Sequence, residues 1–207
     1  MTRTLIITSS PRGQGSKTAA LAETYIAARR MAHPDEVFDR LDLAHEVLPE
    51  FDGDKAAAKM NIITGQSQNG AEQTAWDQIV AIANRFAAAD RYVFAVPMWN
   101  GGIPYRLKQY IDLIHQPGLL FGLDPEKGYF GLLKDKSAIL ILSSGVYAPD
   151  RPSPAFGVDH HGAYLSFWLA QAGVADVTPV RFQPSLLTAD PAANYAAAEA
   201  ELKRLAL

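Results

Sequence analysis

The sequence lacks cysteine, long apolar runs and basic blocks, and each absence excludes a class of protein. Without cysteine there can be no disulfide bonds, cysteine-liganded zinc, iron–sulfur clusters or thiol nucleophile, which fits a reducing compartment. The first apolar run, Leu5–Ile7, is shorter than the core of a secretion signal, and no segment approaches the ~20 apolar residues of a membrane span. The 19 Lys and Arg against 22 Asp and Glu give a net charge of -3, which disfavours a nucleic-acid or membrane partner. We therefore expect a cytoplasmic protein.

What is present is the composition of an ordinary globular protein. The 207 residues are 48% hydrophobic and 20% charged. No internal repeat is visible, and no Gly/Ser or Pro tract separates two halves of the chain. We expect one domain over residues 1–207.

Short apolar runs of strand length alternate along the chain with segments of helical periodicity. The expected strands are Leu5–Thr8, Val37–Leu41, Tyr92–Val96, Ala138–Leu142 and Val177–Phe182. The expected helices are Thr18–Arg30, Trp76–Ala87, Pro104–His115, His160–Ala172 and Pro191–Leu205. This alternation needs crossover connections, so it predicts an α/β fold in which helices cover both faces of a parallel sheet. Ligands bind such sheets beyond the carboxyl ends of the strands, which here are the segments after Thr8, Val96 and Leu142.

The segment after the first strand, SSPRGQGSKT at positions 9–18, has the composition of a phosphate-binding loop. Glycines let the backbone approach an anion, hydroxyls donate hydrogen bonds, and the following helix offers free N–H groups at its positive end. Ser16 separates Gly15 from Lys17, so the loop is not a Walker A motif, and Thr18 replaces the third glycine of the dinucleotide fingerprint. A monophosphate fits better. The alternative is an ordinary strand–helix loop with a capping serine.

The segments after the third and fourth strands predict a planar ligand. In PMWNGGIP, positions 97–104, the aromatic Trp99 is followed by Asn100 and two glycines, which suits a flat ring with backbone amides at its edge. Alternatively, Trp99 is a core residue. The small residues Ser143–Gly145 could surround the polar edge of the same ligand. Together the three segments indicate a site for a phosphate tail and a planar ring.

With these motifs in hand, the chain resembles the FMN-dependent NADH-azoreductases and related NAD(P)H:quinone reductases of the flavodoxin-like superfamily. The resemblance runs from Thr4 to about Val180, and its most specific part is PMWNGGIPYRLKQYID at positions 97–112. The hydroxyl spacing of the first loop, EFDG at positions 50–53 and DHHGAYL at positions 159–165 agree with it. It implies a flavodoxin-like five-stranded parallel sheet in the order 2-1-3-4-5. The FMN-binding residues that it implies are Ser10, Ser16, Lys17, Thr18, Pro97, Met98, Trp99, Asn100, Gly101, Ser143, Ser144, Gly145 and Val146.

The resemblance also implies an activity, namely two-electron, ping-pong reduction of quinones and possibly azo compounds with NADH or NADPH as donor. It places Phe121, Leu123 and Gln171 at the substrate pocket, of which only Phe121 keeps the family's aromatic character. Tyr147 and His160 are possible proton donors at the rim, although a histidine next to Asp159, an expected helix cap, is more often structural. No spacing of His, Asp or Glu suggests a metal site.

Relatives form homodimers with the flavin at the interface, and apolar Phe121, Tyr129, Phe130 and Trp168 could contribute to such a surface or equally to the core. The competing interpretations are a flavodoxin-type electron carrier and a flavin-binding protein without turnover. Carriers tend to be shorter and strongly acidic. The near-neutral charge and the additional segment Gly118–Gly131, expected as a loop suited to covering a pocket, favour an enzyme.

Overall fold

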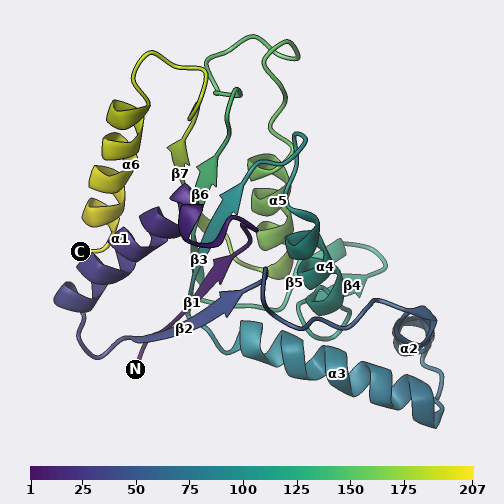
Figure 1. Ribbon diagram of the computed structural model, residues 1–207. Helices are drawn as coiled ribbons and strands as arrows, with labels where there is room; N and C mark the ends of the chain where they lie inside the picture. The colour runs from purple at the N-terminus through teal and green to yellow at the C-terminus, as the bar shows by residue number, and fades with distance from the viewer.

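The computed structural model describes all 207 residues and centres on a five-stranded parallel sheet (Figure 1). The strand order is β2-β1-β3-β6-β7, in which every neighbouring pair is parallel. The strands are β1 (Arg3–Thr8), β2 (Val37–Asp42), β3 (Arg91–Pro97), β6 (Ser137–Ser143) and β7 (Asp176–Phe182). Counted within the sheet alone, this is the expected order. The numbering differs because an antiparallel hairpin of β4 (Phe121–Asp124) and β5 (Gly128–Gly131) precedes β6 in the chain.

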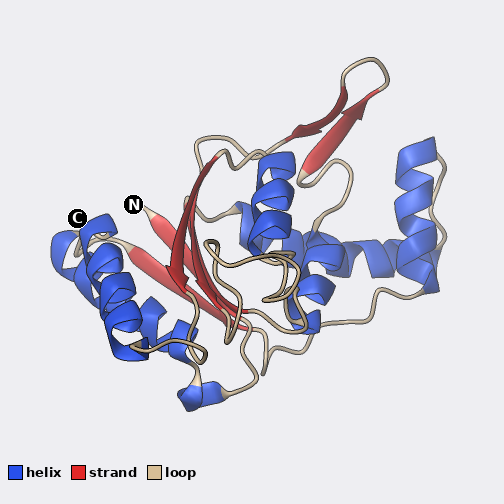
Figure 2. Cartoon of the chain, turned by 90° about the horizontal axis from the view of Figure 1, so that it is seen from above, coloured by secondary structure: helices blue, strands red, loops and turns tan.

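Helices cover both faces of the sheet, as the alternating pattern predicts (Figures 1 and 2). One face carries α1 (Lys17–Ala32) and α6 (Pro191–Leu205), and the other carries α3 (Gly70–Ala87), α4 (Tyr105–Ile114) and α5 (Gly162–Ala172). Side chains alternate across β1, so Ile6 packs under α1 while Leu5 and Ile7 point to the opposite core. None of the helices combines the length and the apolar content that a membrane span requires.

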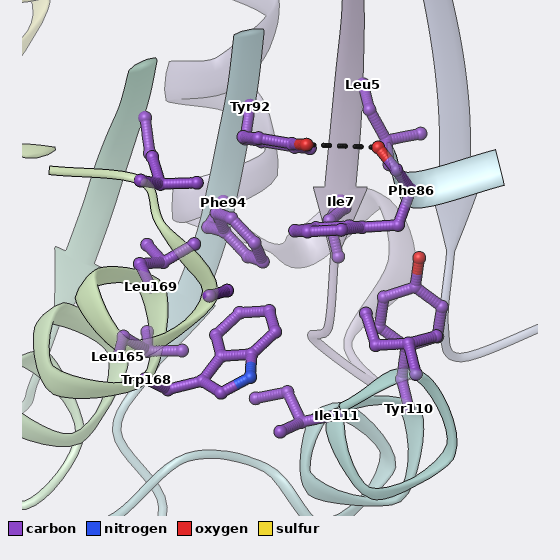
Figure 3. Packing of buried hydrophobic residues seen from close by; sticks show 14 of the residues in the cluster. Leu5, Ile7, Phe86, Tyr92, Phe94, Tyr110, Ile111, Leu165, Trp168 and Leu169 are labelled. Atoms are coloured by element: carbon purple, nitrogen blue, oxygen red, sulfur yellow. Dashed lines mark hydrogen bonds between the residues drawn. The ribbon is translucent and has the colours of Figure 1, made fainter. Parts of the chain in front are cut away.

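The larger core, between the sheet and helices α3 to α5, is built around aromatic rings (Figure 3). Phe86 and Tyr92 stack with ring centroids 4.2 Å apart, and the Tyr92 hydroxyl donates a 3.0 Å hydrogen bond to the Phe86 carbonyl. Trp168 lies edge-on to Phe94 at 6.0 Å and is only 2% exposed. The sequence left open whether Trp168 lies at a subunit surface or in the core, and the structure places it in the core.

Several segments differ from the sequence-based expectation. A helix α2 (Gly53–Thr64) was not expected; it packs on α3 rather than on the sheet. The expected helix Trp76–Ala87 begins earlier, at Gly70, because Asn69 and Glu72 form a capping box ahead of it. The helix expected from His160 begins at Gly162. The segment Gly118–Gly131, expected as a covering loop, contains the β4–β5 hairpin, which projects away from the sheet (Figure 2).

Candidate functional site

The loop between β1 and α1 gathers three buried hydroxyls at the start of α1. Ser10 and Ser16 are each 5% exposed, and Thr18 is 1% exposed. The Ser16 oxygen lies 3.2 Å from the Thr18 hydroxyl and accepts a 3.2 Å hydrogen bond from the Ala19 N–H, so it caps the helix. The N–H groups of the first helical turn have no intrahelical acceptor. Buried hydroxyls and free N–H groups at a positive helix end form a site that suits an anion.

Lys17 follows Ser16 but is exposed, and its ammonium lies over the Tyr195 ring of α6, 5.4 Å from the centroid. The same hydroxyls line a cavity of about 660 Å³, which we call the hydroxyl cavity. Its walls include Ser10, Ser16, Lys17, Thr18, Pro97 and Ser143 from the expected site. The structure therefore brings together expected residues from the ends of β1, β3 and β6.

After β3 the chain makes a tight two-residue turn at Asn100 and Gly101. Trp99 and Gly102 exchange both backbone hydrogen bonds, at 2.9 and 3.0 Å, around Asn100 with φ of 50° and Gly101 with φ of 82°. Positive φ at both central positions is the geometry for which Asn-Gly is the preferred sequence. Because the turn closes through its flanking residues, the N–H groups of Asn100 and Gly101 are not used within it. Trp99, 46% exposed, is not a core residue.

A second cavity, of about 760 Å³, adjoins this turn and is called the aromatic cavity. Trp99 and Asn100 line it, and so does His160 from the loop before α5. Tyr105 at the start of α4 and Tyr164 on α5 complete its aromatic walls. Burial raises the pKa of Tyr164 to about 12, so its hydroxyl stays protonated near neutral pH.

The loop after β6 is fixed mainly by its backbone. Met98 N–H donates to the Ser143 carbonyl at 2.7 Å, which continues the pairing of β3 and β6. The Ser144 carbonyl accepts from Ser185 N–H at 2.8 Å, and its hydroxyl donates to the Tyr147 carbonyl. The Ser144 side chain is therefore already occupied within the loop. Neither cavity is lined by Met98, Gly101, Ser144, Gly145, Val146 or Tyr147.

The three residues expected at the substrate pocket lie on the β4–β5 hairpin and on α5. Phe121 is 7% exposed and packs against the His115 ring, with centroids 4.6 Å apart. His115 Nε2 is 3.0 Å from the Gln171 side-chain oxygen. Leu123 is 57% exposed on the hairpin. The structure brings Phe121 and Gln171 together around His115, but none of the three lines either cavity.

Several cavity residues were not found from the sequence. Tyr105, Arg106 and Lys108 of α4 and Tyr164 of α5 line the aromatic cavity, whereas Ser185 and Tyr195 line the hydroxyl cavity. Arg106 is held by the carbonyls of Leu43 and Glu46, which fixes the β2–α2 connection against α4. The only signal for the α4 and α5 residues was their position in the first turn after a site loop.

Comparison with known proteins agrees with this fold. The family model for the flavodoxin-like fold matches residues 2–206. An FMN-dependent NADH:quinone oxidoreductase of Ruegeria pomeroyi is 50% identical over 202 residues, covering 98% of each chain. A second protein of that name, from Pseudomonas syringae pv. tomato, is 41% identical and covers 98% of this chain and 96% of its own.

Solved structures give the same result. The crystal structure of an azoreductase from Bacillus anthracis str. Sterne is similar with a TM-score of 0.89 at 26% identity, covering 100% of this chain and 99% of that one. An FMN-dependent NADH-azoreductase from Bacillus anthracis str. Ames Ancestor, solved in complex with FMN, has a TM-score of 0.86 at 26% identity, covering 100% and 98%. The sequence match over nearly the whole length and the sheet order together show that this chain belongs to the family with the flavodoxin-like fold.

Proposed function

We propose that this protein is an FMN-dependent NADH:quinone oxidoreductase. The observation that carries the proposal is the arrangement at the carboxyl edge of the sheet, where a buried hydroxyl cradle and an aromatic turn with unused N–H groups lie side by side. FMN has a phosphate for the first and a planar ring for the second. The relatives named FMN-dependent NADH:quinone oxidoreductases match nearly the full length of the chain, which supports the same assignment.

The residues present fit FMN. Ser10, Ser16 and Thr18 with the first turn of α1 would hold the phosphate, because each hydroxyl can donate one hydrogen bond and the helix end attracts negative charge. Trp99 would lie along the ring, and the N–H groups of Asn100 and Gly101 would face a polar edge. When bound, FMN supplies the two-electron chemistry that connects a reduced nicotinamide with an oxidised acceptor.

The chain's own part in the reaction is to bind, orient and shield. Backbone N–H groups at the Asn100–Gly101 turn would face the ring edge and could donate to it without rearrangement, because the turn already holds them in place. Trp99, Tyr105 and Tyr164 give the aromatic cavity flat apolar walls suited to quinones and aromatic azo compounds. Of the two rim donors considered, His160 lines that cavity and Tyr147 lines neither, which supports His160 as the proton donor.

Two features favour an enzyme over the electron carrier and over the flavin-binding protein without turnover. The aromatic cavity, about 760 Å³, has room for an acceptor beside the hydroxyl cavity. The relatives that match this chain are named as oxidoreductases with NADH as donor, so we propose NADH for this chain as well.

Visible absorption spectra of the purified protein test the proposal. The first spectrum is taken after FMN is added, the second after NADH is added without oxygen, and the third after benzoquinone follows. We expect flavin absorption bands that bleach with NADH and return with the quinone. Bound FMN that does not respond to NADH would favour the electron carrier or the flavin-binding protein without turnover. Failure to bind FMN would refute the site assignment.

We also propose that two copies of this chain associate through the β4–β5 hairpin. Support comes from large side chains that the hairpin leaves in solvent, since Leu123, Tyr129 and Phe130 are 57%, 60% and 50% exposed. Analytical ultracentrifugation should give a dimer that Phe130→Ser weakens. Met60→Ser on α2, at a similar 54% exposure, is the control and should leave the dimer intact. A monomeric wild-type protein at all concentrations would contradict the proposal.

A further inference from the structure

A partly buried carboxylate beside the proposed flavin site has no role in the chemistry so far described. The Asp159 side chain is 15% exposed and sits in the loop between β6 and α5. One carboxylate oxygen accepts from Gly162 N–H at 2.6 Å and contacts His161 Nδ1 at 3.0 Å. The other accepts from the Arg181 guanidinium of β7 at 3.2 Å. Asp159 therefore joins its loop to the start of α5 and to the edge strand of the sheet.

Neighbouring residues pack tightly against the Asp159 carboxylate. The His161 side chain is fully buried, and a Cβ at Gly162 would approach the Asp159 carboxylate oxygens to 2.8 and 3.1 Å. Burial opposes ionisation of Asp159, but the Gly162 N–H, His161 and Arg181 outweigh it and hold its pKa below the ordinary value. Asp159 is thus charged at neutral pH.

The residue after Asp159 connects this node to the turn at Trp99. The His160 N–H donates to the Gly101 carbonyl at 3.1 Å, the one backbone hydrogen bond between this loop and the turn. Gly101 itself adopts a positive φ of 82°. The two hydrogen bonds between Trp99 and Gly102 close the turn but do not fix its position against the rest of the site. The bond from His160 does so, and a Cβ at Gly101 would meet His160 and the Val158 carbonyl at 3.9 Å, so this loop packs directly against the turn.

We propose that Asp159 is a positioning residue, which fixes the His160 N–H and through it the Asn100–Gly101 turn that would face the flavin ring. The part that concerns the flavin rests on the proposed function. The part that concerns the turn does not, and Trp99 reports on it directly. Trp99 is 46% exposed, whereas the other two tryptophans, Trp76 and Trp168, are 8% and 2% exposed. Acrylamide quenching of the intrinsic fluorescence therefore measures mainly Trp99.

The test compares Asp159→Asn with Asp150→Asn, since Asp150 lies exposed in the same loop without a side-chain hydrogen bond and the change in charge is the same. In the FMN-free protein we expect Asp159→Asn to raise the quenching constant of Trp99 and Asp150→Asn to leave it unchanged. A Trp99→Phe protein supplies the background. With FMN, we expect Asp159→Asn to raise the Kd about tenfold, because a turn that is no longer held in place must be ordered when FMN binds.

The outcomes separate positioning from general stability and from the proposed function. If Asp159→Asn does not fold, Arg181→Gln removes the guanidinium partner of Asp159 and leaves its hydrogen bond to Gly162. Trp99 quenching and the FMN Kd are then measured on that variant. Wild-type quenching in a folded variant would overturn the proposal. So would changed quenching together with an unchanged FMN Kd. If the wild-type protein binds no FMN, the proposed function fails, while the quenching result still decides whether Asp159 holds the turn.

Discussion

Replacing Ser16 by alanine should weaken FMN binding and destabilise the protein by separate mechanisms. The Ser16 oxygen accepts from the Ala19 N–H at 3.2 Å and caps α1, and removing such a cap costs about 1 kcal/mol of unfolding free energy. The Ser16 and Thr18 hydroxyls lie 3.2 Å apart and either can donate to the other, so when Thr18 donates, the Ser16 oxygen is only an acceptor within the protein and its proton can go to a phosphate. Loss of one hydrogen bond to a charged group costs about 1.5–3 kcal/mol, which raises the FMN Kd by roughly tenfold to a hundredfold.

Asn69→Ala is the matched control for the stability part of this prediction. Asn69 caps α3, where its side-chain oxygen accepts from the N–H groups of Ala71 and Glu72 at 2.9 and 3.0 Å. Its loss should also cost about 1 kcal/mol. Asn69 lines neither cavity, so the FMN Kd of this variant should match the wild-type value.

Urea denaturation of the FMN-free proteins and fluorescence titration with FMN provide the two measurements. The reasoning is refuted if Ser16→Ala binds FMN with the wild-type Kd, because the hydroxyl would then not contact the phosphate. It is equally refuted if Asn69→Ala weakens binding as much as Ser16→Ala, because a general loss of stability would then explain both.

Two further predictions concern stability. Gly173 has φ of 103°, and a Cβ there would lie 3.1 Å from the Leu133 nitrogen, whereas Gly65 has φ of 69° and no atom within 4 Å of its Cβ position. Gly173→Ala should therefore lower the free energy of unfolding by about 1–3 kcal/mol more than Gly65→Ala does. Equal losses in urea denaturation would argue against the close approach of Leu133, which follows the hairpin, to the end of α5. Burial lowers the pKa values of His115 and His161, so the unfolded chain binds more protons, and stability should be greatest above the ordinary histidine pKa of about 6.5 and fall as the pH drops through it. His115→Gln should make this fall shallower, and an unchanged slope would contradict the assignment.

The sheet could be predicted from the sequence because burial on both faces leaves a plain signal. Tyr92–Val96 and Ala138–Leu142 are continuous apolar runs, and both became central strands. The final helix was also predicted with its observed bounds, Pro191–Leu205, since proline is favoured in a first helical turn.

The segments that were missed bury little or have no period. Only Lys55 and Ala58 of α2 are buried, because the helix packs on another helix and leaves Met60, Ile62 and Ile63 in solvent. The strands of the hairpin have four residues each, too few for an alternating pattern to stand out. The capping box of Asn69 and Glu72, by contrast, was readable in the sequence and would have placed the start of α3.

The loops expected to bind the flavin are held together in a way that side chains alone do not reveal. The site loops are tied to one another mainly through backbone atoms, from Met98 N–H to Ser143, from Ser185 N–H to Ser144 and from His160 N–H to Gly101. The side chains that shape the aromatic cavity come from helices that follow these loops, Tyr105 on α4 and Tyr164 on α5. The choice of acceptor should therefore depend on these helical positions more than on the loops, and substitutions there should change acceptor range while leaving FMN affinity intact.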